Sequence, residues 1–301
     1  MGRKQRKKLI MAVAVLVSAW GYQTFSVQAD DGQSSIFSAS ANLPKNQLPN
    51  GHSYFDLKLH PHQKQTISVT VVNDGDTPIK VQSEIRDAYT TDNGAIAYET
   101  PNSHLNHATR YRVSQLTKLK SAKIVTIPAQ SSKKVQAKIT LPKRGNQRGV
   151  MLGGWYLTQV DQATKSTGDV NNQYSYLIGL KYTVGKAVKP KLSLHKVAFD
   201  KQQQPQKLLL QLANKKAALV SDLTYDVKVY QAHGQKALLH QTVPAGSFAP
   251  MSQFNLTVPV DGRMFKSGKY LAKVTAKNKH QKWQLDKQFT VTKTGHIKVK
   301  K

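Results

Sequence analysis

Residues 53–78 read SYFDLKLHPHQKQTISVTVVNDGDTP. In the second half of this stretch, apolar and hydroxyl residues alternate from Thr66 to Val71 before a polar turn. The first half alternates in the same way over residues 55–59, and a turn containing Pro61 joins the two halves. Alternation with a period of two is typical of strands that bury one face. We therefore predict a strand in each half, the second being a central strand of a β-sandwich.

Strand-like runs of this kind recur along the chain. A length of 301 residues suits two domains of about 100–150 residues each. The best helix candidate is the segment 102–120, where Tyr111, Val113, Leu116 and Leu119 are spaced for one helical face. We predict an all-β protein with two β-sandwich domains in tandem and at most one short helix, in the first domain. In the second domain the predicted strands are Leu208–Asn214, Leu223–Val229, Phe254–Val258, Tyr270–Ala276 and Trp283–Val291.

The N-terminal segment of the chain predicts export. Residues 1–29 combine a basic start, an apolar run from Leu9 to Trp20 and a small-residue end, which is the layout of a signal peptide cleaved after Ala29. The alternative is an uncleaved N-terminal anchor, for which the apolar run is short. The remaining segments are a flexible leader (30–40), a first domain (41–185), a second domain (186–292) and a basic tail (293–301).

The composition limits the chemistry. The chain has no cysteine, which excludes disulfides, thiolate catalysis and cysteine-based zinc sites. The formal net charge is +29, and only eight of the 45 basic residues are arginine. Lysine is a hydrated point charge, so this composition suits diffuse attraction to a polyanion better than specific reading of nucleic acid. Export makes a nucleic-acid partner improbable and favours anionic wall polymers or phospholipid headgroups.

Candidate ligand-binding residues are aromatic side chains, because sugar C–H surfaces stack on rings. Trp155 is the first candidate, since it follows two glycines and could lie beside a groove. Asn93 belongs to an Asn93-Gly94 pair that predicts a hairpin turn near the same site. The competing interpretation is that these rings pack in the core or across strands. The other candidates are Tyr156, Tyr89, Tyr98, Tyr174 and Tyr176, whereas Trp283 is assigned to the core.

Other residue patterns give weaker signals. The pair His60 and His62 lacks a nearby acidic cluster, so we predict no metal site and no cofactor. The acidic residues are scattered and no Gly-x-Ser-x-Gly motif is present, so no catalytic residue is assigned. Lysine-rich segments could contact phosphates or carboxylates, although such segments usually form a solvated face. These segments are Lys118–Lys120, Lys143 and Arg144 with Arg148, and Lys277–Lys282.

The order of several short motifs resembles the WxL-interacting proteins. The resemblance covers about residues 35–292, and it depends on the order and spacing of the motifs together. In the first domain the motifs are Pro44-Lys45-Asn46-Gln47, Tyr54-Phe55-Asp56-Leu57, Val72-Asn73, Thr90 to Tyr98 around Asn93-Gly94, and Gly149 to Trp155. In the second they are Ala249-Pro250-Met251-Ser252, Gly268-Lys269-Tyr270, and Trp283 to Val291.

This resemblance implies an exported, non-enzymatic protein of a Gram-positive bacterium, built from two immunoglobulin-like β-sandwiches. It implies a first domain that binds peptidoglycan and a second domain that binds a host or extracellular ligand, with WxL-domain proteins as partners. Two departures stand out. Thr91 occupies a position that is often Asn in the family, and the usual C-terminal transmembrane helix is not evident before Lys301. We therefore expect a wall-associated or secreted protein.

Two other functions stay open from the sequence. The first is an extracytoplasmic assembly chaperone, in which an exposed edge strand pairs with a client by β-strand addition. The second is a wall hydrolase, which would require two carboxylates to converge from the sparse acidic set.

Overall fold

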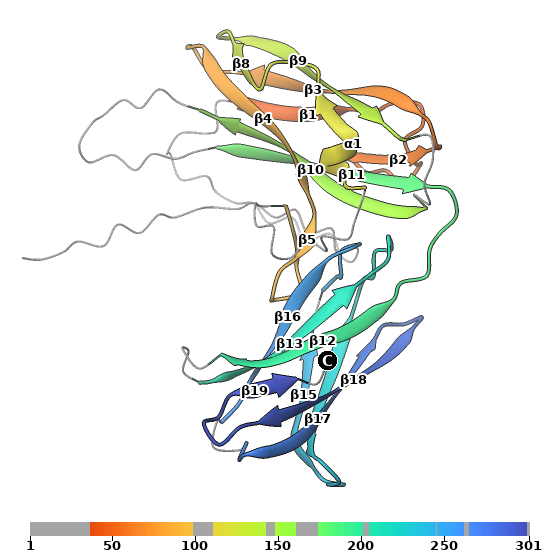
Figure 1. Ribbon diagram of the computed structural model, residues 1–301. Helices are drawn as coiled ribbons and strands as arrows, with labels where there is room; N and C mark the ends of the chain where they lie inside the picture. The colour runs from red at the N-terminus through yellow and green to blue at the C-terminus, as the bar shows by residue number, and fades with distance from the viewer. Residues whose placement is uncertain are drawn as a thin grey trace, which may run out of the picture. The chain divides into compact units, whose positions relative to one another are not determined.

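The structure is a computed structural model that describes residues 37–98, 111–142, 148–160, 174–200, 205–244, 246–261 and 265–299. The predicted signal peptide, most of the leader and the loop 161–173 lie outside these residues. Residues 35–301 form one compact unit. Nearly all regular structure in it is β-strand, and the predicted all-β class is confirmed (Figure 1).

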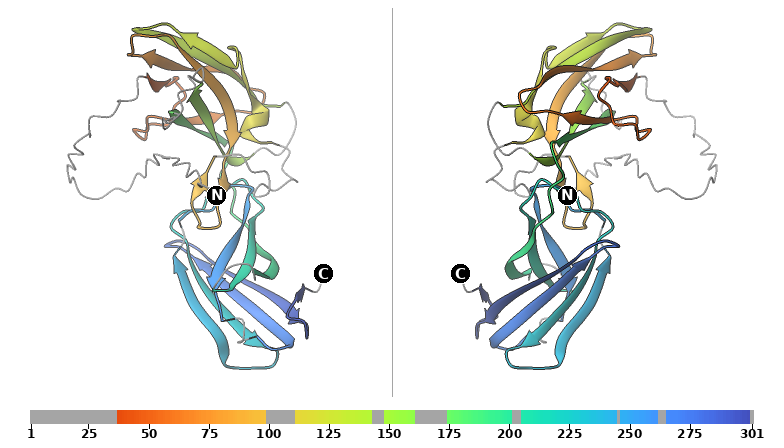
Figure 2. Two further views of the ribbon diagram at one scale, coloured as in Figure 1. Left: turned by 90° about the vertical axis from the view of Figure 1, so that its left-hand side faces the viewer. Right: turned by 90° about the vertical axis from the view of Figure 1, so that its right-hand side faces the viewer.

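The first sandwich has two sheets that face each other across a core (Figures 1 and 2). The first sheet has the order β1 (Phe37–Asn42), β3 (Lys64–Asn73), β9 (Ser131–Thr140), β7 (Thr117–Leu119). The second has the order β2 (Phe55–Leu59), β11 (Ser175–Val184), β10 (Gly149–Gln159), β4 (Ile79–Asp87), β8 (Ile124–Ile127).

Both strands predicted from residues 53–78 are present. β3 pairs with β1 and β9 on its two sides, so it is a central strand. β2 instead lies at the edge of the second sheet, parallel to β11. The segment around Pro61 therefore crosses from one sheet to the other and does not close a hairpin. The backbone there turns at His62, which has a positive φ of 67°.

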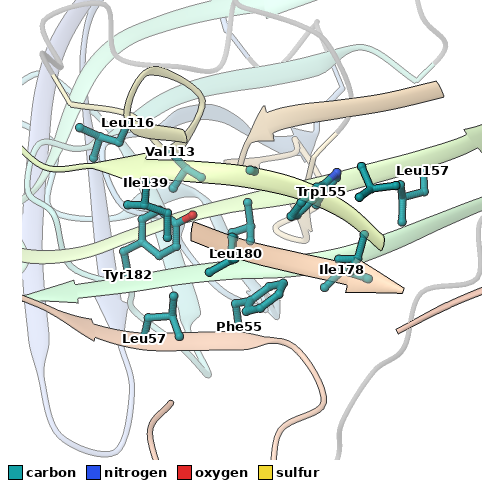
Figure 3. Packing of buried hydrophobic residues seen from close by; sticks show 14 of the residues in the cluster. Phe55, Leu57, Val113, Leu116, Ile139, Trp155, Leu157, Ile178, Leu180 and Tyr182 are labelled. Carbon is teal, nitrogen blue, oxygen red and sulfur yellow. The ribbon is translucent and has the colours of Figure 1, made fainter. Parts of the chain in front are cut away.

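The core of the first sandwich is made by the inward positions of the two sheets. Its largest fully buried side chains include Trp155 of β10 and Tyr182 of β11, which lie among aliphatic residues (Figure 3). Each of these two side chains satisfies its polar atom inside the core. The indole Nε1 of Trp155 donates to Ser83 Oγ at 2.5 Å, and Tyr182 Oη lies 2.9 Å from Thr117 Oγ1. Burial raises the pKa of Tyr182 well above its ordinary value.

The long helix predicted for residues 102–120 is not formed in the part that the structure describes. Helix α1 spans only Val113–Leu116, and the chain continues directly into strand β7. Val113 and Leu116 are buried against the core, as the apolar spacing indicates. The strand pairing of β7 with β9 takes the residues that would have continued the helix. Tertiary pairing thus overrides a marginal local periodicity.

The second sandwich contains the five predicted strands and three more. One sheet has the order β12 (Leu192–Asp200), β13 (Lys207–Asn214), β16 (Gln253–Pro259). The other has the order β15 (Ala237–Pro244), β14 (Thr224–Gln231), β17 (Gly268–Lys277), β18 (Lys282–Val291), β19 (Ile297–Val299). Their inward residues form a second core, separate from the first. Within the described residues, no helix is long and apolar enough to span a membrane.

Candidate functional site

The outer face of the sheet that contains β10 and β11 carries a cluster of aromatic rings, which we call the tyrosine face. It consists of Tyr54, Tyr98, Tyr156 and Leu177 around the glycines Gly154 and Gly179. The three rings are half-buried, and Leu177 is 41% exposed. Trp155, Ile178 and Leu180 point into the core. The residues that alternate with them along β10 and β11 therefore point outward, onto this face.

Two glycines directly opposite each other form the floor of the tyrosine face. Gly154 of β10 pairs in register with Gly179 of β11. A Cβ atom on Gly154 would come within 2.3 Å of Leu177 Cδ1 and 3.1 Å of Tyr98 Cδ1. A Cβ on Gly179 would lie 3.3 Å from the Tyr54 ring. The missing side chains therefore let Tyr54, Tyr98 and Leu177 lie directly on the sheet backbone.

An ion pair borders the tyrosine face on the β4 side. Arg86 Nη2 lies 2.8 Å from Glu84 Oε2, and Lys123 Nζ lies 3.2 Å from Glu84 Oε1. The guanidinium of Arg86 also lies over the Tyr156 ring, with Cζ 4.1 Å from the ring centroid. The hydrogen bond from Arg86 is the main reason that the pKa of Glu84 is lowered. Arg86 thus presents a cation beside an aromatic surface.

A second, more buried ion pair borders the face on the β2 side. Lys181 Nζ lies 2.9 Å from Asp56 Oδ2, and Asn50 Nδ2 donates to the same oxygen at 2.5 Å. The Asp56 side chain is fully buried, whereas that of Lys181 is 26% exposed. The other oxygen, Oδ1, has no hydrogen-bond partner among the described residues. Lys181 therefore supplies the opposite charge beside a buried carboxylate at this edge.

The pKa values show that the tyrosines share one environment. Burial raises the pKa of Tyr98, and its neighbours Tyr54 and Tyr156 raise it further. Burial also raises the pKa of Tyr54, with a further contribution from Asp56. The phenols of Tyr54 and Tyr98 therefore stay protonated at neutral pH and can donate and accept hydrogen bonds. Two of the predicted ligand-binding residues, Tyr98 and Tyr156, are brought together here.

The surface position expected for Trp155 and Tyr89 is not observed. Trp155 is fully buried, and its indole ring belongs to the core. Of the two preceding glycines, Gly154 lies on the outer face of the sheet together with Tyr156, because alternation turns Trp155 inward. Tyr89 is only 4% exposed. Neither ring can stack on a ligand without opening the fold.

The remaining aromatic candidates also pack inward. Tyr174 and Tyr176 are half-buried against the first core, and Tyr176 makes an edge-to-face contact with Phe37 at 4.9 Å between ring centroids. Trp283 is partly buried and packs against the second core. For these three residues, the interpretation as packing residues is the one that the structure supports.

Asn93 shapes a turn that touches the second domain. β5 (Tyr89–Thr90) and β6 (Ile96–Ala97) form the predicted hairpin, with Gly94 at a positive φ of 80°. The Asn93 side-chain oxygen accepts hydrogen bonds within its own turn, from the Thr91 hydroxyl and from Ala95 N at 3.3 Å. The Gly94 carbonyl accepts a hydrogen bond from Ser247 N at 3.0 Å. This position suits a structural role for Asn93.

The hairpin belongs to a hydrogen-bonded joint between the two sandwiches. Thr90 Oγ1 accepts from Ala249 N at 2.9 Å and lies 3.0 Å from Ser252 Oγ, and both hydroxyl residues are fully buried. Asn255 N donates to Asp92 Oδ1 at 2.8 Å. Two motifs that are distant in the sequence, 90–98 and 249–252, therefore interlock.

A second part of the joint depends on Gly149. Val150 N donates to Ala217 O at 2.7 Å, which brings the start of β10 against the second domain. A Cβ on Gly149 would lie 2.0 Å from that carbonyl oxygen, and its φ of 109° already disfavours other residues. The backbone at Gly149 therefore approaches the second domain so closely that no side chain fits there.

The sequence predictions missed half of the tyrosine face. Tyr54 and Leu177 follow from alternation once the inward residues Phe55 and Ile178 are known, but nothing in the sequence pairs Gly154 with Gly179. That pairing is set by the register of β10 and β11. The contribution of Arg86 needs the register of β4 with β10 in the same way.

The tyrosine face offers stacking surfaces and hydrogen-bonding phenols, and its two flanking cations are each paired with a carboxylate of the chain. These groups suit binding of a ligand that has both apolar ring faces and hydrogen-bonding groups. Within the described residues, no group of three His, Asp or Glu side chains could hold a metal ion.

Comparisons with known proteins address both halves of the chain. Residues 37–159 match the family model "WxL Interacting Protein, peptidoglycan binding domain", and residues 165–300 match "WxL Interacting Protein, host binding domain". No curated protein matches the chain. Among solved structures, the chain is similar to the YadV chaperone, at 14% identity over 84% of this chain and 99% of that chain, with a TM-score of 0.35. It is also similar to the E. coli chaperone DraB, at 14% identity over 83% of this chain and 96% of that chain, with a TM-score of 0.32. These two similarities concern the fold alone.

Proposed function

Because this chain belongs to the WxL-interacting protein family, we propose that it is an exported, non-enzymatic binding protein of a Gram-positive cell surface. In this proposal the first domain attaches to peptidoglycan through the tyrosine face. The second domain engages a WxL-domain protein or a host ligand. The observation that carries the proposal is the Gly154–Gly179 floor with tyrosine rings around it.

The chemistry of peptidoglycan matches this face. Its sugars have C–H surfaces that stack on aromatic rings, and Tyr54, Tyr98 and Tyr156 supply such rings. Its stem peptides carry carboxylates, which would compete with Glu84 for the guanidinium of Arg86 beside the Tyr156 ring. Tyr54, Tyr98 and Leu177 cover the glycine floor, so a ligand would contact these side chains and not the sheet backbone.

The test is sedimentation of the full chain with purified peptidoglycan from which anionic polymers have been removed. We expect Tyr156→Ala to weaken binding about fivefold to tenfold, because ring truncation at the centre of an interface costs more than 1 kcal/mol. The matched control is Tyr230→Ala in the second domain. Tyr230 is also half-buried on an outer face, and Lys273 Nζ lies over its ring at 5.4 Å. Equal losses for both variants, or no loss for Tyr156→Ala, would contradict the assignment.

The role of the second domain has its own test. Co-precipitation of the full chain with a purified WxL-domain protein should survive Tyr156→Ala, since that residue lies in the first domain. Loss of the partner in this variant would show that the tyrosine face binds protein and not peptidoglycan.

A further inference from the structure

The opposite outer face of the first sandwich has a different composition. Its four strands, β1, β3, β9 and β7, contain five lysines and no aspartate or glutamate. Inward positions of these strands fill the core, so the alternate positions form one polar face. We call it the lysine face, and its members are Lys64, Lys118, Lys134, Lys138, Ser40, Asn42, Thr66, Ser68, Thr70, Gln136 and Thr140.

Strand register arranges these side chains in rows. Lys138 of β9 lies opposite Thr66 of β3 on one side and Lys118 of β7 on the other. Lys134 lies opposite Thr70, two pleats further along. The two lysines of β9 are four positions apart, which corresponds to roughly 13 Å along the strand. The face therefore presents separated cations with hydroxyl groups between them.

The lysines of this face are available to a ligand. Lys64, Lys134 and Lys138 are exposed, and none of the three forms an ion pair with a described residue. Lys118 is also exposed, and it donates a hydrogen bond to the Ser114 carbonyl at 2.9 Å. Lysines near the other sheet differ, since Lys181 is already paired with a carboxylate.

The neighbouring groups select the kind of anion. Lysine suits phosphate as a point charge without a fixed contact geometry. The hydroxyl and amide groups can bind the hydroxyls of a polyol, and one such set is already ordered. Asn42 Nδ2 donates to Ser68 Oγ at 3.1 Å and to Thr70 Oγ1 at 3.0 Å. No outward position of these strands carries an aromatic ring, so bases of a nucleic acid would find no stacking partner.

We propose that the lysine face is a second binding surface, for a linear polyol-phosphate polymer of the cell wall. Phosphodiesters of such a polymer lie against Lys134, Lys138 and Lys118, and its free hydroxyls contact Thr66, Ser68 and Thr70. This inference goes beyond the proposed attachment to peptidoglycan, because it uses the opposite sheet and a different ligand. Two wall polymers would then be held by one domain, which raises the avidity of attachment.

The test measures binding of purified poly(glycerol phosphate) to the full chain by calorimetry over about 50–200 mM salt. We expect Lys134→Gln/Lys138→Gln to weaken binding at least fivefold. The slope of log K against log salt should fall by about 1.4, since two phosphate contacts are lost at roughly 0.7 each. The matched control is Lys273→Gln/Lys277→Gln. These two exposed lysines lie four residues apart on β17 and remove the same charge. The control should change the affinity less than twofold.

Three results would overturn the proposal. The first is an equal loss in both double variants, which would assign the binding to net charge. The second is absence of binding to poly(glycerol phosphate). The third is equal or tighter binding of single-stranded DNA or poly-glutamate with the same number of charges. The proposed function is tested separately, because Lys134→Gln/Lys138→Gln should sediment normally with polymer-free peptidoglycan, and Tyr156→Ala should bind poly(glycerol phosphate) normally.

Discussion

On one outer face of the first sandwich, the rings of Tyr54, Tyr98 and Tyr156 surround a glycine pair. On the other, lysines and hydroxyls project from strands without a single acidic residue. Both faces are the outward half of the same period-two alternation. The fold needs only that outward positions tolerate water, so these positions were free to diverge toward different ligands. Both proposed binding surfaces thus consist of outward residues, whereas the inward residues stabilise the fold.

The largest effect is expected from a change in the core that both outer faces share. Trp155→Ala should lower the free energy of unfolding of the first domain by about 3–5 kcal/mol, because a large buried ring is replaced by a cavity. Ser83 Oγ would also lose the hydrogen bond from the indole. Hydrogen exchange measured strand by strand should show faster exchange in β3 and β10 alike, with β14 and β17 unchanged.

The control for this change is Trp283→Ala, which is only partly buried in the second domain. It should have a smaller effect, confined to the second domain. A loss below 1 kcal/mol for Trp155→Ala, or faster exchange in only one sheet of the first domain, would contradict the assignment of Trp155 to the common core.

A change at the edge of the tyrosine face should lower stability and leave binding at the lysine face unchanged. Lys181→Met leaves the buried Asp56 carboxylate with the Asn50 amide as its partner among the described residues. We expect a loss of about 2 kcal/mol in unfolding free energy, since hydrogen bonds to charged groups contribute roughly 1.5–3 kcal/mol. Urea unfolding checks this value. Poly(glycerol phosphate) binding by the folded variant should be unchanged.

The matched control is Lys58→Met. Lys58 is an exposed lysine on the neighbouring strand β2 and forms no ion pair with a described residue. It should cost less than about 0.5 kcal/mol, as surface substitutions usually do. Similar losses in the two variants would mean that the Asp56–Lys181 pair has no special role.

The sequence alone predicts the inward-facing residues of the strands well. Alternation around Ile67 and Val69 predicts a central strand, and the strand is central. The Asn93-Gly94 pair predicts a hairpin turn, which is present. These features depend on residues close together in the chain. The prediction fails where a long-range pairing decides the outcome.

The outward half depends on register, which a single sequence does not contain. The two glycines before Trp155 make it the first candidate for the binding site. The alternation of side chains along β10 instead turns Trp155 inward and Tyr156 outward. The helix expected up to residue 120 ends at Leu116, because β7 pairs with β9. The rows of the lysine face likewise arise only when β3, β9 and β7 lie side by side.

The smallest expected effect concerns pH. Arg86 and Lys123 hold the pKa of Glu84 below its ordinary value of 4.5 in the folded state. A lowered folded pKa adds stability above the unfolded pKa, and this stability is lost as the pH falls through the folded value. Wild type should therefore exceed Glu84→Gln by about 0.5 kcal/mol at pH 7, and the difference should vanish at pH values below the folded pKa. Urea unfolding at pH 7 and in acid measures it, with Asp286→Asn as the control of equal charge on an exposed site of the second domain. A difference that persists in acid would mean that Glu84 acts through packing and not through its charge, which would weaken the contrast between a paired tyrosine face and an unpaired lysine face.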